Sequence, residues 1–120
     1  MGQPVIHWEI AAADPDKLWD FYTKMFGWKI DSNNSMKYGI AETGGDGGIN
    51  GGIYANDDEG ARGITFYVQV EDLEAALTQA ESLGGKKVME PCPIPEAGIS
   101  IAMFTDPEGH RIGILSPTAP

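Results

Sequence analysis

The sequence predicts an α+β fold built from two β-α-β-β-β modules, because one pattern of elements occurs twice along the chain. Residues Val5–Ile10 and Gly63–Val70 are rich in β-branched and aromatic side chains, which favour strands. An amphipathic stretch follows each strand and ends at a glycine, Gly27 in the first case and Gly84 in the second. Each module leaves one face of its sheet bare, so the two can share a curved half-barrel sheet with the helices outside.

This repeat predicts a single domain over residues 1–120, with module one at about 4–56 and module two at about 62–117. Aligning the two first strands pairs His7 with Thr65. We expect the ligand site on the concave face of the shared sheet, because ligands bind in hollowed surfaces.

The two helices have clear start and stop signals. Asp14 is a typical N-cap and Pro15 suits the first helical position, which predicts a helix over 14–26. Asp72 is the corresponding cap of a second helix over 72–83. Both helices carry apolar side chains at helical spacing on one face: Leu18, Phe21, Tyr22, Met25 and Phe26 in the first, and Leu73, Ala76, Leu77 and Ala80 in the second.

Turn residues separate the remaining strands. Asp106–Gly109 contains Asp, Pro and Gly in the order typical of a tight turn, which predicts a closing hairpin. Thr43–Gly52 is glycine-rich and is interpreted as a flexible turn, and Pro91–Pro95 as a rigid connection. The further predicted strands are Trp28–Asp31, Lys37–Glu42, Ile53–Ala55, Lys86–Glu90, Ile99–Phe104 and Arg111–Leu115.

Composition excludes several classes of function. The formal charge of −10 comes from 18 acidic and 8 basic side chains, and it would repel a nucleic-acid backbone. No apolar run approaches the roughly 20 residues of a membrane span. The single cysteine, Cys92, excludes an internal disulfide and suits a reducing compartment, so we expect a cytoplasmic protein.

The chain resembles the vicinal oxygen chelate superfamily, which includes glyoxalase I, extradiol dioxygenases and bleomycin-resistance proteins. The resemblance covers nearly the whole chain and is closest to a glyoxalase-related group. It rests on the paired modules and on the order of these motifs: His7, Asp20–Tyr22, Gly27–Trp28, Val70–Leu77 and Asp106–Gly109.

The resemblance implies where metal ligands would lie. His7 matches the first ligand position of the metalloenzymes. The other matched positions are held by residues 51–53 (Gly-Gly-Ile), by Thr65 and by Gly113, which lack a suitable ligand side chain. A catalytic metal needs about three protein ligands, so we expect no tightly bound metal and no cofactor, with His7 as the remaining candidate ligand. An alternative facial group would combine His7 with Glu9 and Glu42.

Strand alternation predicts which side chains line the concave face. Gly113 would leave room there for a group of the ligand. Trp8, Phe66, Val68 and Phe104 are expected under the helices, while Ile30, Ile40 and Ile101 add to the apolar wall. The predicted ligand-binding residues are His7, Glu9, Trp28, Tyr38, Glu42, Thr65, Tyr67, Gln69, Met103 and Arg111.

Three functions fit these observations. The first is a metal-free protein that binds a partly apolar small molecule, as bleomycin-resistance proteins do. The second is an enzyme, either a metal-dependent lyase, isomerase or dioxygenase, or an acid/base catalyst that uses Glu9 or Glu42. The third is a scaffold whose concave face is filled by its own side chains. We also expect a homodimer, because half-open sheets leave edges that invite pairing.

Overall fold

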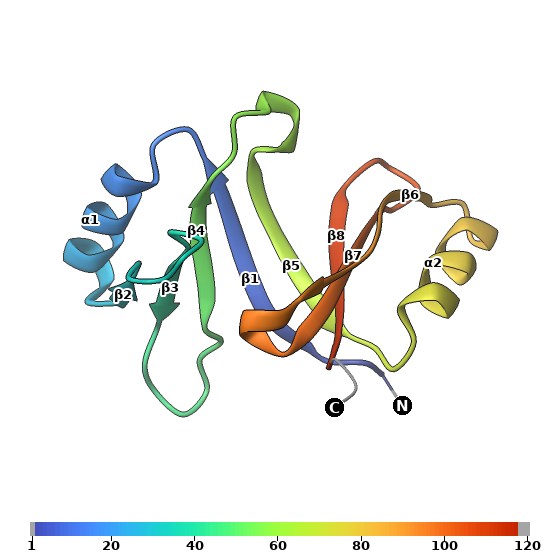
Figure 1. Cartoon of the computed structure of the whole chain (residues 1–120), viewed down its shortest axis with the longest axis horizontal. Helices are drawn as coiled ribbons and strands as arrows, with labels where there is room; N and C mark the ends of the chain where they lie inside the picture. Colours follow the sequence, from blue (N-terminus) through green and yellow to red (C-terminus); the bar gives the residue numbers. More distant parts are fainter. Residues whose placement is uncertain (1, 118–120) are drawn as a thin grey trace. The chain divides into compact units, whose positions relative to one another are not determined.

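The computed structural model describes residues 2–117, which divide into two compact units. The first unit comprises Ile6–Thr65, and the second runs from Phe66 onward and includes the start of the chain up to Val5. Each unit has one α-helix and four strands (Figure 1).

The first unit has the order β-α-β-β-β. Its strands follow the sheet order β2-β3-β4-β1, with β1 and β4 parallel and the other pairs antiparallel. A short 3-10 helix, η1 (Glu59–Ala61), follows the last strand. The main elements are β1 (Val5–Ala12), α1 (Pro15–Phe26), β2 (Lys29–Asp31), β3 (Gly39–Glu42) and β4 (Gly51–Ala55).

Helix α1 starts and ends where the sequence predicts. Pro15 occupies the first turn. Gly27 adopts the left-handed conformation, and its N–H donates to the Thr23 carbonyl. Asp14 lies at the N-cap position but makes no side-chain capping bond. The helix packs on β2 and β4, and the indole of Trp19 donates to the Ile53 carbonyl at 3.0 Å. This bond fixes α1 on one face of the sheet.

The second unit repeats the order. Its strands follow the order β5-β8-β7-β6, with β5 and β8 parallel and the other pairs antiparallel. A 3-10 helix, η2 (Pro95–Ala97), links β6 to β7. The main elements are β5 (Gly63–Gln69), which begins in the first unit, α2 (Leu73–Ser82), β6 (Lys86–Ile94), β7 (Ile99–Thr105) and β8 (Arg111–Pro117).

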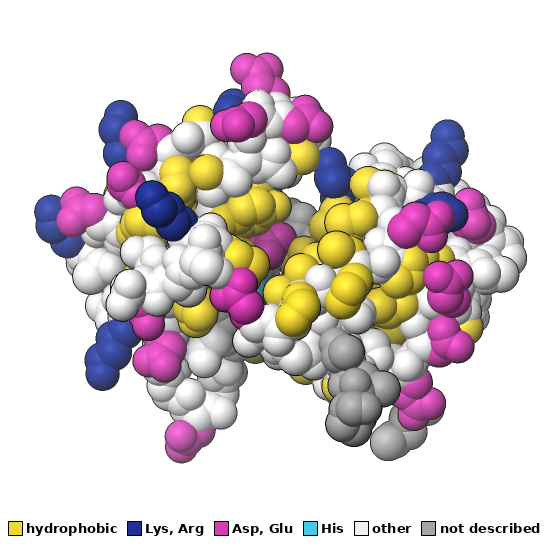
Figure 2. Space-filling view, in the orientation of Figure 1, with side chains coloured by type: hydrophobic (Ala, Val, Ile, Leu, Met, Phe, Trp, Pro, Cys, Tyr) yellow, Lys and Arg dark blue, Asp and Glu magenta, His cyan; other side chains and the backbone are white. Residues whose placement is uncertain are grey.

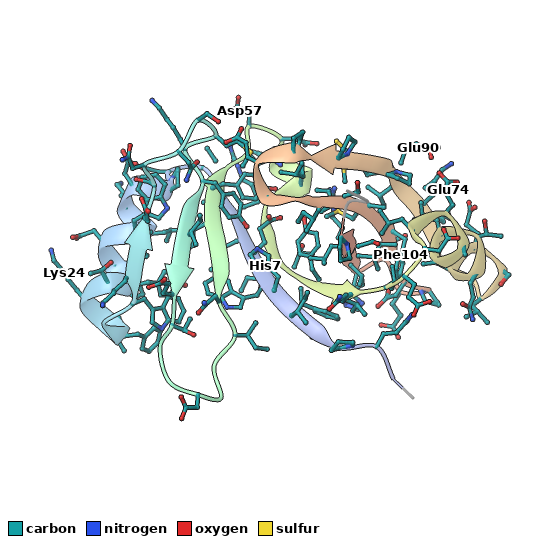
Figure 3. All side chains as sticks on the ribbon, turned by 60° about the horizontal axis from the view of Figure 1, so that its bottom comes forward. His7, Lys24, Asp57, Glu74, Glu90 and Phe104 are labelled. Carbon is teal, nitrogen blue, oxygen red and sulfur yellow. The ribbon has the colours of Figure 1, made fainter. Side chains whose placement is uncertain are left out.

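The core of the second unit lies between α2 and its sheet. The Asp72 carboxylate accepts from the Ala75 N–H at 3.1 Å and caps the helix. Leu73 and Leu77 then pack with Val70, Ala102 and Ile114, and the partly buried Val68 and Phe104 join this cluster (Figure 3). Val68 and Phe104 therefore lie under a helix as predicted, whereas the side chain of Phe66 is exposed.

The predicted closing hairpin is confirmed. The Asp106 carboxylate accepts from the N–H groups of Glu108 and His110 at 2.9 and 3.0 Å, and Gly109 has a positive φ of 94°. The hydrogen bond from the His110 N–H is the main reason that the pKa of Asp106 lies below its ordinary value.

One boundary prediction is wrong. The prolines of Pro91–Pro95 predict a rigid connection, but strand β6 continues through residues 91–94. Proline cannot donate to a ladder, but β6 lies at the end of its sheet, where one side of the strand needs no partner. Breaks in the register between Lys87 and Cys92 accompany these prolines.

The predicted α+β fold with two β-α-β-β-β modules is confirmed by this element order. None of the helices within residues 2–117 is long and apolar enough to span a membrane. Acidic side chains are spread over the visible face, with Lys and Arg interspersed (Figure 2).

Candidate functional site

The sheet of the first unit has two chemically different faces. Trp8 lies on the face that α1 covers, since its ring is 5.2 Å from that of Trp28, which in turn stacks on Tyr22 of the helix. Side chains alternate along a strand, so His7 and Glu9 lie on the opposite face. This face opposite α1 is where the polar groups of the candidate site lie.

Three side chains form a hydrogen-bonded chain on this face (Figure 3 labels His7 on β1). His7 Nε2 lies 2.8 Å from the hydroxyl oxygen of Tyr38. The same hydroxyl donates to Glu9 Oε2, also at 2.8 Å. Residues far apart in sequence, from β1 and from the residue preceding β3, therefore meet in one network.

The direction of this chain follows from counting protons. A tyrosine hydroxyl has one proton, and Tyr38 donates it to the carboxylate of Glu9, which can only accept. The hydroxyl oxygen must then accept from His7, so Nε2 of the imidazole carries a proton. Burial lowers the pKa of His7 below its ordinary value of 6.5, which favours the neutral ring at pH 7. The network thus runs from the imidazole N–H through the phenol to the carboxylate.

The ring of Tyr38 fits closely against its surroundings. A Cβ atom at Gly52 would overlap this ring, so only glycine leaves enough space there. The ring of Tyr54 stacks on the ring of Tyr38, with the two centroids 5.7 Å apart. Gly52 is the direct partner of Glu9 across the parallel pair β1–β4, which places the phenol beside the carboxylate.

Two predicted members of this face lie elsewhere. Trp28 packs against Trp8, Tyr22 and Phe26, so its assignment to the ligand-binding face is wrong. Ile30 pairs with Ala41, which is fully buried, and therefore also faces α1. Both errors have one cause: alternation places Trp28 and Ile30 on the same face, but it does not say which face α1 covers.

The alternative metal group is not formed. Glu42 lies on β3 and is exposed. Within residues 2–117, no three His, Cys, Asp or Glu side chains are close enough together to hold a metal ion. A metal at Nε2 of His7 would also have to displace the proton that this atom gives to Tyr38.

The corresponding face of the second unit is filled by its own side chains. Tyr67, only 3% exposed, forms a buried cluster with Met103 and Leu115. The ring of Tyr67 lies over Gly113, where a Cβ atom would overlap it. The prediction that Gly113 leaves room for a ligand is therefore wrong. The guanidinium of Arg111 lies 3.4 Å from the Met103 sulfur.

The remaining predicted residues are less closely grouped. Thr65 is partly buried on β5, two positions before Tyr67. Gln69 ends the same strand and lines a depression of about 860 Å³ between residues 2–4 and the start of α2. The ligand-binding roles of both residues stay predictions.

Sequence reasoning missed the roles of Tyr54, Gly52 and Asn34. Tyr54 shares the face of Gly52 by alternation along β4, but the predicted strand began after both glycines. A glycine inside a strand indicates close approach of another group, and this signal could have identified Gly52. Asn34 lies between the predicted strands Trp28–Asp31 and Lys37–Glu42, and no sequence signal indicates that its amide bonds the main chain of Tyr38.

Comparisons with known proteins agree with this fold. A family model described as Glyoxalase/Bleomycin resistance protein/Dioxygenase superfamily matches residues 5–114. A curated protein of Vibrio cholerae, named probable lactoylglutathione lyase, is 28% identical, with 92% of this chain and 88% of that protein covered.

Solved structures show the same fold. A glyoxalase/bleomycin resistance protein/dioxygenase superfamily member from Vibrio splendidus 12B01 matches with a TM-score of 0.66 and 14% identity, covering 96% of this chain and 99% of that one. Methylmalonyl-CoA epimerase from Mycobacterium tuberculosis matches with a TM-score of 0.63 and 24% identity, covering 97% and 88%.

Proposed function

The chain belongs to the Glyoxalase/Bleomycin resistance protein/Dioxygenase superfamily, and we propose that it binds a partly apolar small molecule without a metal ligated by His7. The observation that carries the proposal is the His7–Tyr38–Glu9 network on the face opposite α1. Fixed polar groups beside aromatic rings are the usual means by which a site orients a small ligand.

The network favours binding over metal chemistry because of where its protons lie. Nε2 of His7 acts as a donor, whereas a metal ligand must offer a lone pair. Gly113 holds one of the positions that the resemblance matches to metal ligands, and the Tyr67 ring occupies the adjoining space. Neither feature suits the three-ligand centre of a metalloenzyme.

Native mass spectrometry of the purified protein tests this proposal. We expect a retained organic molecule, or its uptake from a fragment mixture, without a stoichiometric transition metal. Tyr38→Phe should weaken retention, since it removes the hydroxyl that links His7 to Glu9. Tyr22→Phe is the matched control, because Tyr22 belongs to α1 and stacks on Trp28, on the opposite face of the sheet. One zinc or nickel ion per chain, lost in His7→Gln, would overturn the proposal.

The same spectra report subunit number. We propose a homodimer, and a species at the monomer mass of 12.9 kDa at high micromolar concentration would contradict it.

A second candidate is an acid/base enzyme. The Glu9 carboxylate bonds a phenol that is itself bonded to an imidazole, so the network offers groups able to accept and return a proton. In this reading Glu9 removes a proton from a carbon beside a carbonyl and returns it to a neighbouring atom. The name of the Vibrio cholerae relative, probable lactoylglutathione lyase, favours a carbonyl substrate of this type.

Activity and isotope exchange separate the two candidates. The protein would be incubated with methylglyoxal and glutathione, and separately with S-lactoylglutathione in D₂O. An enzyme would form product or exchange the carbon-bound proton, and Glu9→Gln would abolish either reaction. Glu108→Gln, which changes an exposed turn residue, is the control. Neither turnover nor exchange leaves the binding function.

A further inference from the structure

We propose that Asn34 is a positioning residue for the candidate site, an inference that rests on the proposed function. Its side-chain amide bonds the main chain of Tyr38 at both polar groups. Asn34 Nδ2 donates to the Tyr38 carbonyl at 2.8 Å, and the Tyr38 N–H donates to Asn34 Oδ1 at 2.9 Å. One side chain therefore replaces the two bonds that a neighbouring strand would provide.

Tyr38 needs such support because of where it lies. It precedes β3, which begins at Gly39, so no strand pairing fixes its main chain. Lys37 has a φ of 51°, a left-handed conformation that costs energy in a residue other than glycine. Without the Asn34 amide, we expect the segment to relax and to carry the phenol away from its two partners.

Only asparagine combines the donor, the acceptor and the side-chain length that these two bonds to Tyr38 need. Aspartate keeps the acceptor for the Tyr38 N–H but loses the donor to the carbonyl, and serine is too short to bond both groups. The contacts of Tyr38 with Gly52, with Tyr54 and with the His7–Glu9 pair hold the ring rather than the main chain. Asn34 thus determines where the hydroxyl sits between imidazole and carboxylate.

The imidazole of His7 reports the position of Tyr38. Burial lowers its pKa, and Tyr38 is one of the groups that cover it. If Tyr38 moves away, water reaches His7 and the pKa should rise towards 6.5. A purely structural role for Asn34 would lower the melting temperature but leave this pKa unchanged.

The test is an NMR titration of His7 in the full chain. We expect a raised pKa in Asn34→Ala, a smaller rise in Asn34→Asp, and none in Asn33→Ala, which changes an exposed side chain. Asp72→Ala removes a comparable side-chain-to-backbone bond in the second unit and controls for lost stability alone.

Two results would overturn the inference: an unchanged His7 pKa in both Asn34 variants, or an equal rise in Asp72→Ala. Failure of the proposed function has a different signature. In that case Tyr38→Phe leaves ligand retention unchanged, whereas the effect of Asn34 on the His7 pKa can still be measured.

Discussion

The two units place a tyrosine over a glycine in the same part of the sheet, but they bring the ring from different strands. In the second unit Tyr67 comes from the first strand and covers Gly113, its direct partner on the last strand. In the first unit the equivalent strand position holds Glu9, opposite Gly52, and the covering ring is that of Tyr38.

This exchange changes the chemistry of the face. Tyr67 is buried among Met103 and Leu115, so its unit gains an apolar cluster. Tyr38 bonds Glu9 and His7, so its unit gains a polar network. Moving one ring to another strand therefore gives one copy of a repeated fold a buried apolar cluster and the other a polar network.

The largest expected effect is the loss of stability in Tyr67→Ala. Truncating a buried aromatic ring typically costs about 3–5 kcal/mol, because it leaves a cavity among its neighbours. Tyr38→Ala should cost clearly less, since Tyr38 is only partly buried. Urea denaturation of both variants measures the difference. Equal losses would show that the two rings do not differ in role.

Alanine substitutions at Gly113 and at Gly52 test the same difference between the two tyrosine rings. Gly113→Ala should lower the free energy of unfolding by about 1–3 kcal/mol, because its Cβ overlaps a buried ring that cannot move away. Gly52→Ala should cost less, since Tyr38 can swing out, but it should break the bonds to His7 and Glu9. Gly47→Ala is the control, because a Cβ there meets open space. A larger loss for Gly52 than for Gly113 would contradict the comparison.

The same overlap affects the design of a metal site. Thr65→His with Gly113→Glu would place ligand side chains at two of the positions that the family resemblance matches to metal ligands, but the new glutamate would meet the Tyr67 ring. We therefore expect a gain only when Tyr67→Ala is added, as measured by calorimetric zinc titration. An increase in the double variant alone would show that Tyr67 moves aside easily.

Removing the helix-cap side chains should change stability by a smaller amount, and by different amounts in the two units. Asp72→Ala should cost about 1 kcal/mol, because it removes the bond from the Ala75 N–H. Asp14→Ala should cost much less, since the Asp14 side chain makes no capping bond. Thermal unfolding followed by circular dichroism compares them, and similar losses would indicate that Asp14 caps its helix in solution.

The smallest expected effect is a pH dependence that belongs to the first unit. Burial lowers the pKa of His7, while the unfolded chain keeps a value of about 6.5. Below that pH the unfolded chain takes up a proton that the folded chain does not, so stability falls from pH 6.5 down to the lowered pKa. His7→Gln should flatten this part of the stability profile. A parent profile that is flat below pH 6.5 would refute the expectation.

Features that depend on neighbouring residues can be predicted from the sequence. The repeat, both helices, the glycine that ends α1 and the Asp106–Gly109 turn follow from local chemistry: capping, apolar periodicity and the φ angles that proline and glycine adopt. The shared face of His7 and Glu9 also follows, because strand alternation is a local rule.

Contacts between residues far apart in the chain cannot be predicted in the same way. The side on which Trp28 packs depends on the rings of Trp8 and Tyr22, and the continuation of β6 through its prolines depends on its place at the end of a sheet. The pairing of Tyr38 with Gly52 likewise joins a loop to a strand. Such contacts depend on the register of strands that are remote in sequence, and a shift of one residue reverses the face of every side chain.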